Sequence, residues 1–360
     1  MSAIVDRIVT WGPMALVAIL GFGVLIVVHE LGHFLVARLF GMRVERFSIG
    51  FGPVLWSRRR GDTDWAISAV PLGGYVRIAG MSPGEEIASG DAGAFCNQPA
   101  WRRFLVILAG PAMNYAFAVV LAIGLVATLG LWAPDPAAVV GDVLPGGAAK
   151  RGGLVPGDRV LAADGRPVDG WAALVEAVRA SPGRDLALDV RRAGAPEGSP
   201  PVRVVVRPDD VGGVGKLGMT PSLLPVRTGP VDAVVQGFRR TNQRAAAIVT
   251  DLGRVLTGRQ KGEMMGPVGI AQEMARSARA GAGPFLMLVW LISIMLAIFN
   301  FLPFPALDGG RLAFLGYEIV ARRPANQKVE SWIHAIGFVV LLALLLGVTV
   351  FGDLPRLLRR

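Results

Sequence analysis

Hydrophobic and polar positions follow one another along the chain in long blocks. Four apolar runs, each close to the roughly 20 residues that a helix needs to cross a bilayer of about 30 Å, cover residues 14–38, 104–132, 284–304 and 332–352. The second and third runs contain no Asp, Glu, Lys, Arg or His. Hydrophobic residues make up 52% of the chain and charged residues only 18%, which agrees with this pattern. The sequence therefore predicts a polytopic α-helical membrane protein with four transmembrane helices.

The polar blocks between these runs have three different patterns. In residues 47–78, alternating runs on both sides of a charged turn predict a β-hairpin region. The next block is punctuated by Gly and Pro, alternates in DLALDVRRAG and PVRVVVRP, and has helical spacing from 171 to 180, which predicts an inserted α+β domain. Residues 229–260 have the pattern of an amphipathic helix, for which a position on the membrane surface is the simplest interpretation. The expected domains are a first membrane half, the inserted domain, an amphipathic linker helix region and a second membrane half, in residues 1–132, 133–225, 226–283 and 284–360.

Arginine and lysine indicate the orientation, because these residues in short loops are retained on the cytoplasmic side of a membrane. Segment 38–103 carries nine arginines, and the loop after the third run adds three arginines and a lysine. Both loops should therefore be cytoplasmic and the inserted domain extracytoplasmic, although the basic tail 356–360 favours the opposite orientation. The net charge of +10 comes from scattered residues, and no basic patch is interleaved with aromatic residues. We therefore expect a lipid bilayer and no nucleic acid as a partner.

Two histidines and a glutamate interrupt the first apolar run in the stretch VVHELGHFLV. Polar side chains of this kind are costly at membrane depth and indicate a function there. On a helix, His29 and His33 lie on one face and can bind one metal ion, while Glu30 lies close enough to act as a base beside it. Cys96 is the only cysteine, which excludes intrachain disulfides and cysteine-based zinc sites. The simpler alternatives are a polar turn at the headgroup boundary and histidines hydrogen-bonded inside the bundle.

A catalytic zinc site needs a third protein ligand and an open position. Asp308 is the best candidate, because it lies in NFLPFPALDGG, where two prolines end the third helix and two glycines free the backbone. The first and third helices end on the same side of the membrane, so Asp308 can meet His29 and His33. His334 begins the fourth run and is more simply an interfacial residue, while helix capping remains an alternative for Asp308.

With these motifs in place, the chain resembles the site-2 protease family of intramembrane zinc metalloproteases, in particular its bacterial members that act in regulated intramembrane proteolysis. The resemblance is carried by HELGH, by NFLPFPALDGG, by FGP and PLGGYV in the first loop, by AGPAMN at 109–114 and by MGPVGIA at 265–271. Residues 143–168, VLPGGAAKRGGLVPGDRVLAADGRPV, resemble a PDZ domain. The inserted domain is therefore expected to be a single PDZ domain.

The resemblance implies one catalytic zinc ion (Zn2+), with Glu30 as the catalytic base and three metal ligands, His29, His33 and Asp308. Substrate contacts are implied for Asn300 and Asn114. We also expect one edge of the hairpin to pair with an unwound substrate, at Gly73, Gly74, Tyr75 and Val76.

The implied function is that of an intramembrane zinc metalloendopeptidase of the bacterial cytoplasmic (inner) membrane, with its active site toward the cytoplasm. Its substrates would be single-span membrane proteins, such as anti-sigma factors or signal-peptide remnants, already trimmed by an upstream site-1-type protease. Two other classes stay open from the residues alone. A membrane PDZ scaffold would not need Glu30, and a metal transporter would more usually carry polar residues along several spans.

Overall fold

The computed structural model describes residues 2–82, 85–88, 90–259 and 265–355. It divides into two compact units, one formed by Met1–Val126 with Pro230–Arg360 and one formed by Ala127–Gly229. The basic tail 356–360, which bears on the predicted orientation, lies outside the described residues.

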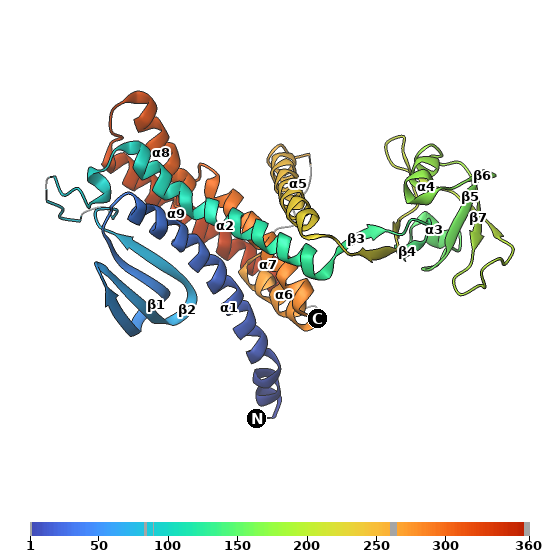
Figure 1. The fold of residues 1–360 in the computed structure, drawn as a ribbon, viewed down its shortest axis with the longest axis horizontal. Coiled ribbons are helices and arrows are strands. Elements are labelled where there is room, and N and C mark those ends of the chain that lie inside the picture. The colour runs from blue at the N-terminus through green and yellow to red at the C-terminus, as the bar shows by residue number, and fades with distance from the viewer. Residues whose placement is uncertain (1, 83–84, 89, 260–264, 356–360) are drawn as a thin grey trace. The chain divides into compact units, whose positions relative to one another are not determined.

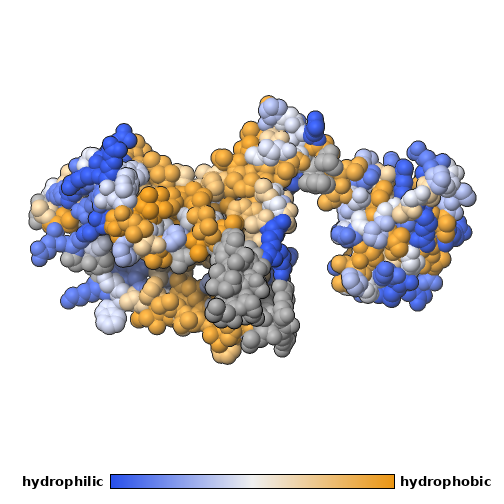
Figure 2. All heavy atoms as spheres, turned by 90° about the horizontal axis from the view of Figure 1, so that it is seen from below, coloured by the Kyte–Doolittle hydropathy of each residue, from blue (hydrophilic) through white to orange (hydrophobic). Residues whose placement is uncertain are grey.

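Long apolar helices build the first unit (Figure 1). Among the described residues, four helical stretches are long and apolar enough to cross a membrane, Leu16–Leu39, Ala100–Leu129, Ala282–Phe301 and Lys328–Asp353. They belong to α1 (Ser2–Leu39), α2 (Ala100–Leu129), α7 (Ala282–Phe301) and α9 (Gln327–Gly347), which continues into the π-helical η2 (Val348–Asp353). The prediction of four apolar helices is confirmed. Figure 2 shows hydrophobic residues over much of the surface of this unit, as expected for helices that contact lipid.

Glycines allow close contacts between these helices. A Cβ added at Gly32 would lie 2.1 Å from the carbonyl oxygen of Ala109, so α1 and α2 touch backbone to backbone. On another face α1 packs against α6 (Pro267–Ala280), where the Met274 side chain fills the space beside Gly21. One apolar cluster joins α1, α6 and α7, and its buried members are Ala18, Leu25, Met274, Val289 and Ile292.

The predicted hairpin is formed by β1 (Val44–Arg60) and β2 (Thr63–Ile78). Its register is irregular, because residues 46–49 of β1 pair both with 64–67 and with 74–77 of β2. The end of β2 therefore has β1 on one side, and on its other side no strand among the described residues pairs with it. In the loop that follows lies the short 3-10 helix η1 (Phe95–Asn97). A cluster of Ala37, Met42, Val44, Ile78 and Val106 packs the hairpin against α1 and α2.

The predicted amphipathic region contains two helices, α5 (Pro230–Leu256) and α6, and residues 260–264 between them lie outside the described residues. The carboxylate of Asp353 in η2 accepts hydrogen bonds of 3.0 Å from the backbone N–H groups of Gly266 and Gly269, at the start of α6. This contact fixes the N-terminus of α6 to the end of the described chain. A last helix, α8 (Asp308–Ala321), connects α7 to α9.

The second unit is a mixed α/β fold around its own apolar core. Its main sheet has the order β6-β5-β7-β8, from Arg166–Pro167, Arg159–Ala163, Leu186–Arg191 and Val202–Val206. The helices are α3 (Ala148–Arg151) and α4 (Gly170–Arg179). Three strand pairs complete it, β3 (Leu131–Pro134) with β12 (Leu223–Val226), β4 (Val140–Val143) with β11 (Met219–Pro221), and β9 (Asp209–Asp210) with β10 (Gly215–Lys216). Leu154, Leu174, Leu186, Leu188 and Val190 lie in the core.

Candidate metal centre

Three side chains that the sequence predicts as metal ligands come together in the first unit. His29 and His33 lie one turn apart on α1, and Asp308 is the first residue of α8. Nε2 of His29 lies 2.9 Å from Oδ2 of Asp308 and 3.2 Å from Nε2 of His33, which in turn lies 3.3 Å from the same carboxylate oxygen. Ligand atoms bound at about 2.0–2.2 Å to one tetrahedral zinc ion lie about 3.3 Å apart. The triangle of donor atoms therefore has the size of a zinc site.

The hydrogen bond of Nδ1 of His33 shows which ring nitrogen carries the proton and which one can bind a metal. Its Nδ1 lies 2.8 Å from the carbonyl oxygen of Val106. Because a carbonyl oxygen can only accept, Nδ1 carries the proton, and the neutral ring presents a lone pair on Nε2 to Asp308 and His29. Acceptor atoms at this distance repel one another unless a cation lies between them. The donor set therefore fits a divalent metal with nitrogen and oxygen ligands.

Asn114 of α2 stands behind the other histidine. It is fully buried, its Nδ2 lies 3.2 Å from Nδ1 of His29, and its Oδ1 has no hydrogen-bond partner among the described residues. If the Asn114 amide is rotated by half a turn, its Oδ1 accepts a hydrogen bond from an Nδ1–H group of His29. Nε2 of His29 then carries no proton and can bind a metal. Asn114, predicted as a substrate contact, therefore lies where it can orient a metal ligand.

Helix α2 also approaches the two histidines through a glycine. A Cβ added at Gly110 would lie 2.4 Å from Nε2 of His33 and 2.8 Å from Nε2 of His29. Only a hydrogen atom fits at this position while both rings keep their places. The sequence contains this glycine in AGPAMN, but the spacing of HExxH does not indicate its role.

The loop between α7 and α8 delivers Asp308. Ala306 has a φ of 75°, in the left-handed region, and a Cβ added at Gly309 would lie within 1.8 Å of the carbonyl oxygen of Leu302. This tight turn sets the carboxylate against α1.

Glu30 faces the same space as the three ligands. Its Oε2 accepts a hydrogen bond of 3.1 Å from the backbone N–H of Val76, on the edge of β2. A pocket of about 420 Å³ is lined by both residues, by the three ligands and by His334, among others. An acidic side chain, a set of metal donors and a strand edge therefore open onto one pocket.

The remaining predicted substrate contacts lie outside the residues that line this pocket. Gly73, Gly74 and Tyr75 continue the edge of β2 beside Val76. Asn300 lies in the last turn of α7, where its side chain donates a hydrogen bond of 3.1 Å to the carbonyl oxygen of Leu296. Val76 is thus the one predicted substrate contact that lines the pocket among the described residues.

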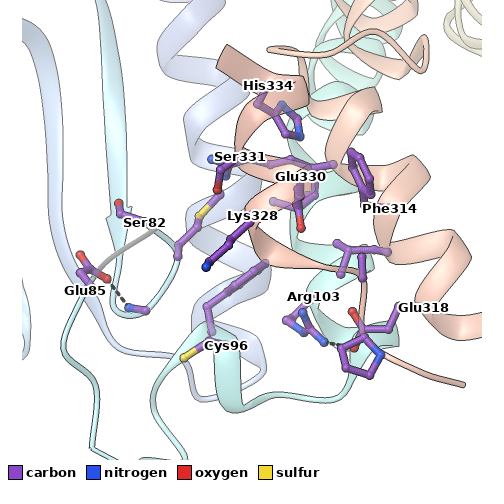
Figure 3. A pocket seen from close by; sticks show the side chains of 18 of the residues that line it. Ser82, Glu85, Cys96, Arg103, Phe314, Glu318, Lys328, Glu330, Ser331 and His334 are labelled. Atoms are coloured by element: carbon purple, nitrogen blue, oxygen red, sulfur yellow. Dashed lines mark hydrogen bonds and ion pairs between the residues drawn. The ribbon is translucent and has the colours of Figure 1, made fainter. Parts of the chain in front are cut away.

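A second pocket, of about 790 Å³, adjoins the first and shares Met81, Arg311 and His334 with it. Charged side chains line this larger pocket, as Figure 3 shows, among them Lys328 and the ion pair of Arg103 with Glu318. His334 therefore stands where the two pockets meet, whereas the sequence favours an interfacial position for it.

The order of these motifs can be compared with known families. The sequence pattern of peptidase family M50 matches residues 17–344, a range that includes the two histidines, Glu30 and Asp308. The chain belongs to peptidase family M50. As an M50 peptidase with His29, His33 and Asp308 placed to hold a metal ion, the protein is a metalloprotease.

The chain aligns with curated relatives over almost the whole length of each. Regulator of sigma-E protease RseP of Escherichia coli is 31% identical over 445 aligned residues, which cover 94% of this chain and 98% of the relative. Zinc metalloprotease RasP of Geobacillus kaustophilus is 30% identical over 414, covering 93% and 96%. Protease RseP of Yersinia pestis is 31% identical over 451, covering 94% and 98%. Each alignment exceeds the 360 residues of this M50 chain, so each relative contains inserted residues.

Proposed function

We propose that this M50 protein is an intramembrane zinc endopeptidase that cleaves the membrane-spanning segments of single-span proteins. The observation that supports it most is the position of His29, Glu30 and His33 in a helix apolar enough to cross a membrane, with Asp308 against them. The relative named zinc metalloprotease RasP supports zinc as the ion, and the relative named regulator of sigma-E protease RseP supports a role in regulated proteolysis.

The chemistry assigns separate roles to the residues of the pocket. His29, His33 and Asp308 would hold the zinc ion. When bound there, zinc lowers the pKa of a water molecule to about 7 and polarises the peptide carbonyl. Glu30 takes the proton of the attacking water on its carboxylate and passes it to the leaving amine nitrogen. The N–H of Val76 holds this carboxylate in position, and Asn114 keeps His29 in the orientation that presents Nε2.

The substrate would have to unwind, because a transmembrane helix engages its own carbonyl groups in hydrogen bonds. We propose that the unwound segment pairs with the edge of β2 at Gly73, Gly74, Tyr75 and Val76, with Asn300 as a further contact. The edge is next to Glu30 through the Val76 contact, so a strand added there passes the base. Replacing Val76 with proline removes an N–H of this edge that also holds Glu30, so turnover alone does not separate the two roles. The proline variant should lose both turnover and affinity for a peptide inhibitor, whereas Val76→Ala keeps the N–H and should retain both. Unchanged inhibitor affinity in the proline variant would contradict the pairing.

The unit Ala127–Gly229 is proposed to be a PDZ domain that screens the extracytoplasmic parts of substrates. Its order of short strands and helices, and the glycine-rich stretch 143–168, support this assignment. The basic loops support an inner-membrane orientation with the metal centre toward the cytoplasm. Deleting residues 135–225 should allow cleavage of substrates that an upstream site-1-type protease has not trimmed. A deletion variant with unaltered selectivity would refute the screening role.

The protease assignment is tested with Glu30→Gln in the full chain and a single-span reporter. Cleavage should disappear while the zinc content of the purified protein stays at one ion, because glutamine replaces the base and leaves the ligands. Glu197→Gln, an exposed position in the second unit, is the charge-matched control and should cleave normally. Normal function of the Glu30 variant would favour a PDZ scaffold or a metal transporter instead.

A further inference from the structure

His334 carries a hydrogen-bond donor that no described residue uses. Its Nδ1 accepts a hydrogen bond of 3.0 Å from the backbone N–H of Ala306. A neutral imidazole carries one proton, so the proton of His334 is on Nε2. That nitrogen is buried and has no hydrogen-bond partner among the described residues.

The position of this ring is fixed relative to the metal ligands. Ala306 lies two residues before Asp308, so the loop that delivers the carboxylate is anchored on Nδ1 of His334. The ring also lies over the start of α8, where a Cβ added at Gly310 would be 3.1 Å from its Cε1. Behind it, a Cβ added at Gly337 would lie 2.2 Å from Cβ of Pro305, so α9 packs directly on the same loop. One nitrogen of His334 thus holds the loop, and the other is a buried donor that no described residue accepts from.

A buried donor without an acceptor is unfavourable and uncommon in folded proteins. His334 is the one ionisable residue between Ser331 and Gly347 of α9, a stretch in which an apolar side chain would avoid this cost. It lines the metal pocket together with Glu30 and Asp308. An acceptor that enters the pocket with a ligand would satisfy the donor, and a peptide brings carbonyl oxygens.

We propose that Nε2–H of His334 donates a hydrogen bond to a backbone carbonyl oxygen of the substrate in the metal pocket. The inference rests on the proposed protease function and adds to it a substrate-binding donor from α9. The peptide would then be held from two elements, by the edge of β2 at Val76 and by His334.

Two substitutions separate the nitrogens of this ring. His334→Asn places an amide oxygen near the position of Nδ1, so the bond to Ala306 can form, but the side chain is too short to reach the position of Nε2. His334→Gln reaches the position of Nε2 with its amide nitrogen and lacks the nearer acceptor. Loss of one neutral hydrogen bond to a substrate carbonyl lowers kcat/KM by up to about tenfold. We expect kcat/KM of the asparagine variant on the single-span reporter to fall by about tenfold and the glutamine variant to retain most activity.

Binding provides a readout that does not depend on turnover. The affinity of a peptide phosphinate inhibitor should fall in the asparagine variant, while zinc content and the midpoint of thermal unfolding stay at the wild-type values. Wild-type kcat/KM in the asparagine variant would overturn the inference. A glutamine variant less active than the asparagine variant would also overturn it, because His334 would then act through the Ala306 loop alone. If the unmodified protein cleaved no reporter, the proposed function would fail and the inference with it.

Discussion

Replacing Gly110 with alanine perturbs the metal centre without touching a ligand. The added methyl carbon would lie 2.4 Å from Nε2 of His33 and 2.8 Å from Nε2 of His29, whereas Cβ atoms in proteins essentially never approach other atoms closer than 3.0 Å. The rings or the two helices must therefore move by several tenths of an ångström. Zinc sites tolerate deviations of about 0.2 Å in their ligand distances. The movement is larger than three fixed ligands can absorb.

The size of the effect follows from this displacement. Disturbing a residue that orients a metal ligand costs about 10–100-fold in metal affinity, and Gly110 touches two ligands at once. We expect zinc affinity to fall by about 100-fold, which corresponds to about 2.8 kcal/mol at 25 °C. Overfilling the helix contact should also lower the free energy of unfolding of the metal-free protein by about 1–3 kcal/mol.

The assay is a zinc competition titration with a chromophoric chelator on detergent-purified protein, followed by turnover of the single-span reporter. Gly316→Ala on α8 is the matched control, because a Cβ added there meets no atom within 4 Å. This control should bind zinc and cleave as the unmodified protein does. Wild-type zinc affinity in Gly110→Ala would refute the contact between α2 and the metal ligands.

Three carboxylates give further predictions. Asp308→Asn should lose zinc and all cleavage, and chelator treatment of the unmodified protein should reproduce that loss until zinc is restored, as metal analysis and turnover would record. Asp353→Ala leaves both N–H groups at the start of α6 without their acceptor and should lower the free energy of unfolding by about 1–3 kcal/mol, measured by thermal unfolding in detergent. The fully buried carboxylate of Asp158 accepts hydrogen bonds from two backbone N–H groups and from the partly exposed Arg192. Replacing Asp158 with alanine should lower the free energy of unfolding of the second unit by about 1–3 kcal/mol. Limited proteolysis of the full chain should then cut faster within residues 127–229. An unchanged rate of proteolysis in this segment would contradict the prediction.

The apolar helices could be predicted from the sequence because a run of about 20 apolar residues has few stable alternatives in a bilayer. Their ends could not, since helices continue past the apolar run where the backbone permits, as α1 does by starting at Ser2. The sequence predicts one amphipathic helix over 229–260, and it predicts no separate helix at α6, which lies in the linker region 226–283. The contact of Asp353 with the start of α6 joins residues 84 and 87 positions apart, and no local pattern encodes such a distance.

Some residues of the candidate site could also be predicted from the sequence, and others could not. His29, Glu30 and His33 are recognisable because four-residue spacing on a helix brings side chains to one face. Asp308 required a topological argument, and the geometry of its carboxylate beside both histidines agrees with that argument. His334 could not be found in this way, since its role depends on which loop packs against α9 and on which nitrogen that loop occupies.

Helix α2 supplies no metal ligand, yet its sequence contains the counterpart of HExxH. Val106, Gly110 and Asn114 are four residues apart and so lie on one face of α2. Val106 accepts from Nδ1 of His33, Gly110 makes room for both Nε2 atoms, and Asn114 lies against Nδ1 of His29. The two helices run antiparallel with matching spacing, so one face of α2 fixes the positions and tautomers of both histidines. In the sequence only Gly110 and Asn114, four residues apart in the second apolar span, mark this support, because the backbone carbonyl of Val106 would be present whatever residue stood there.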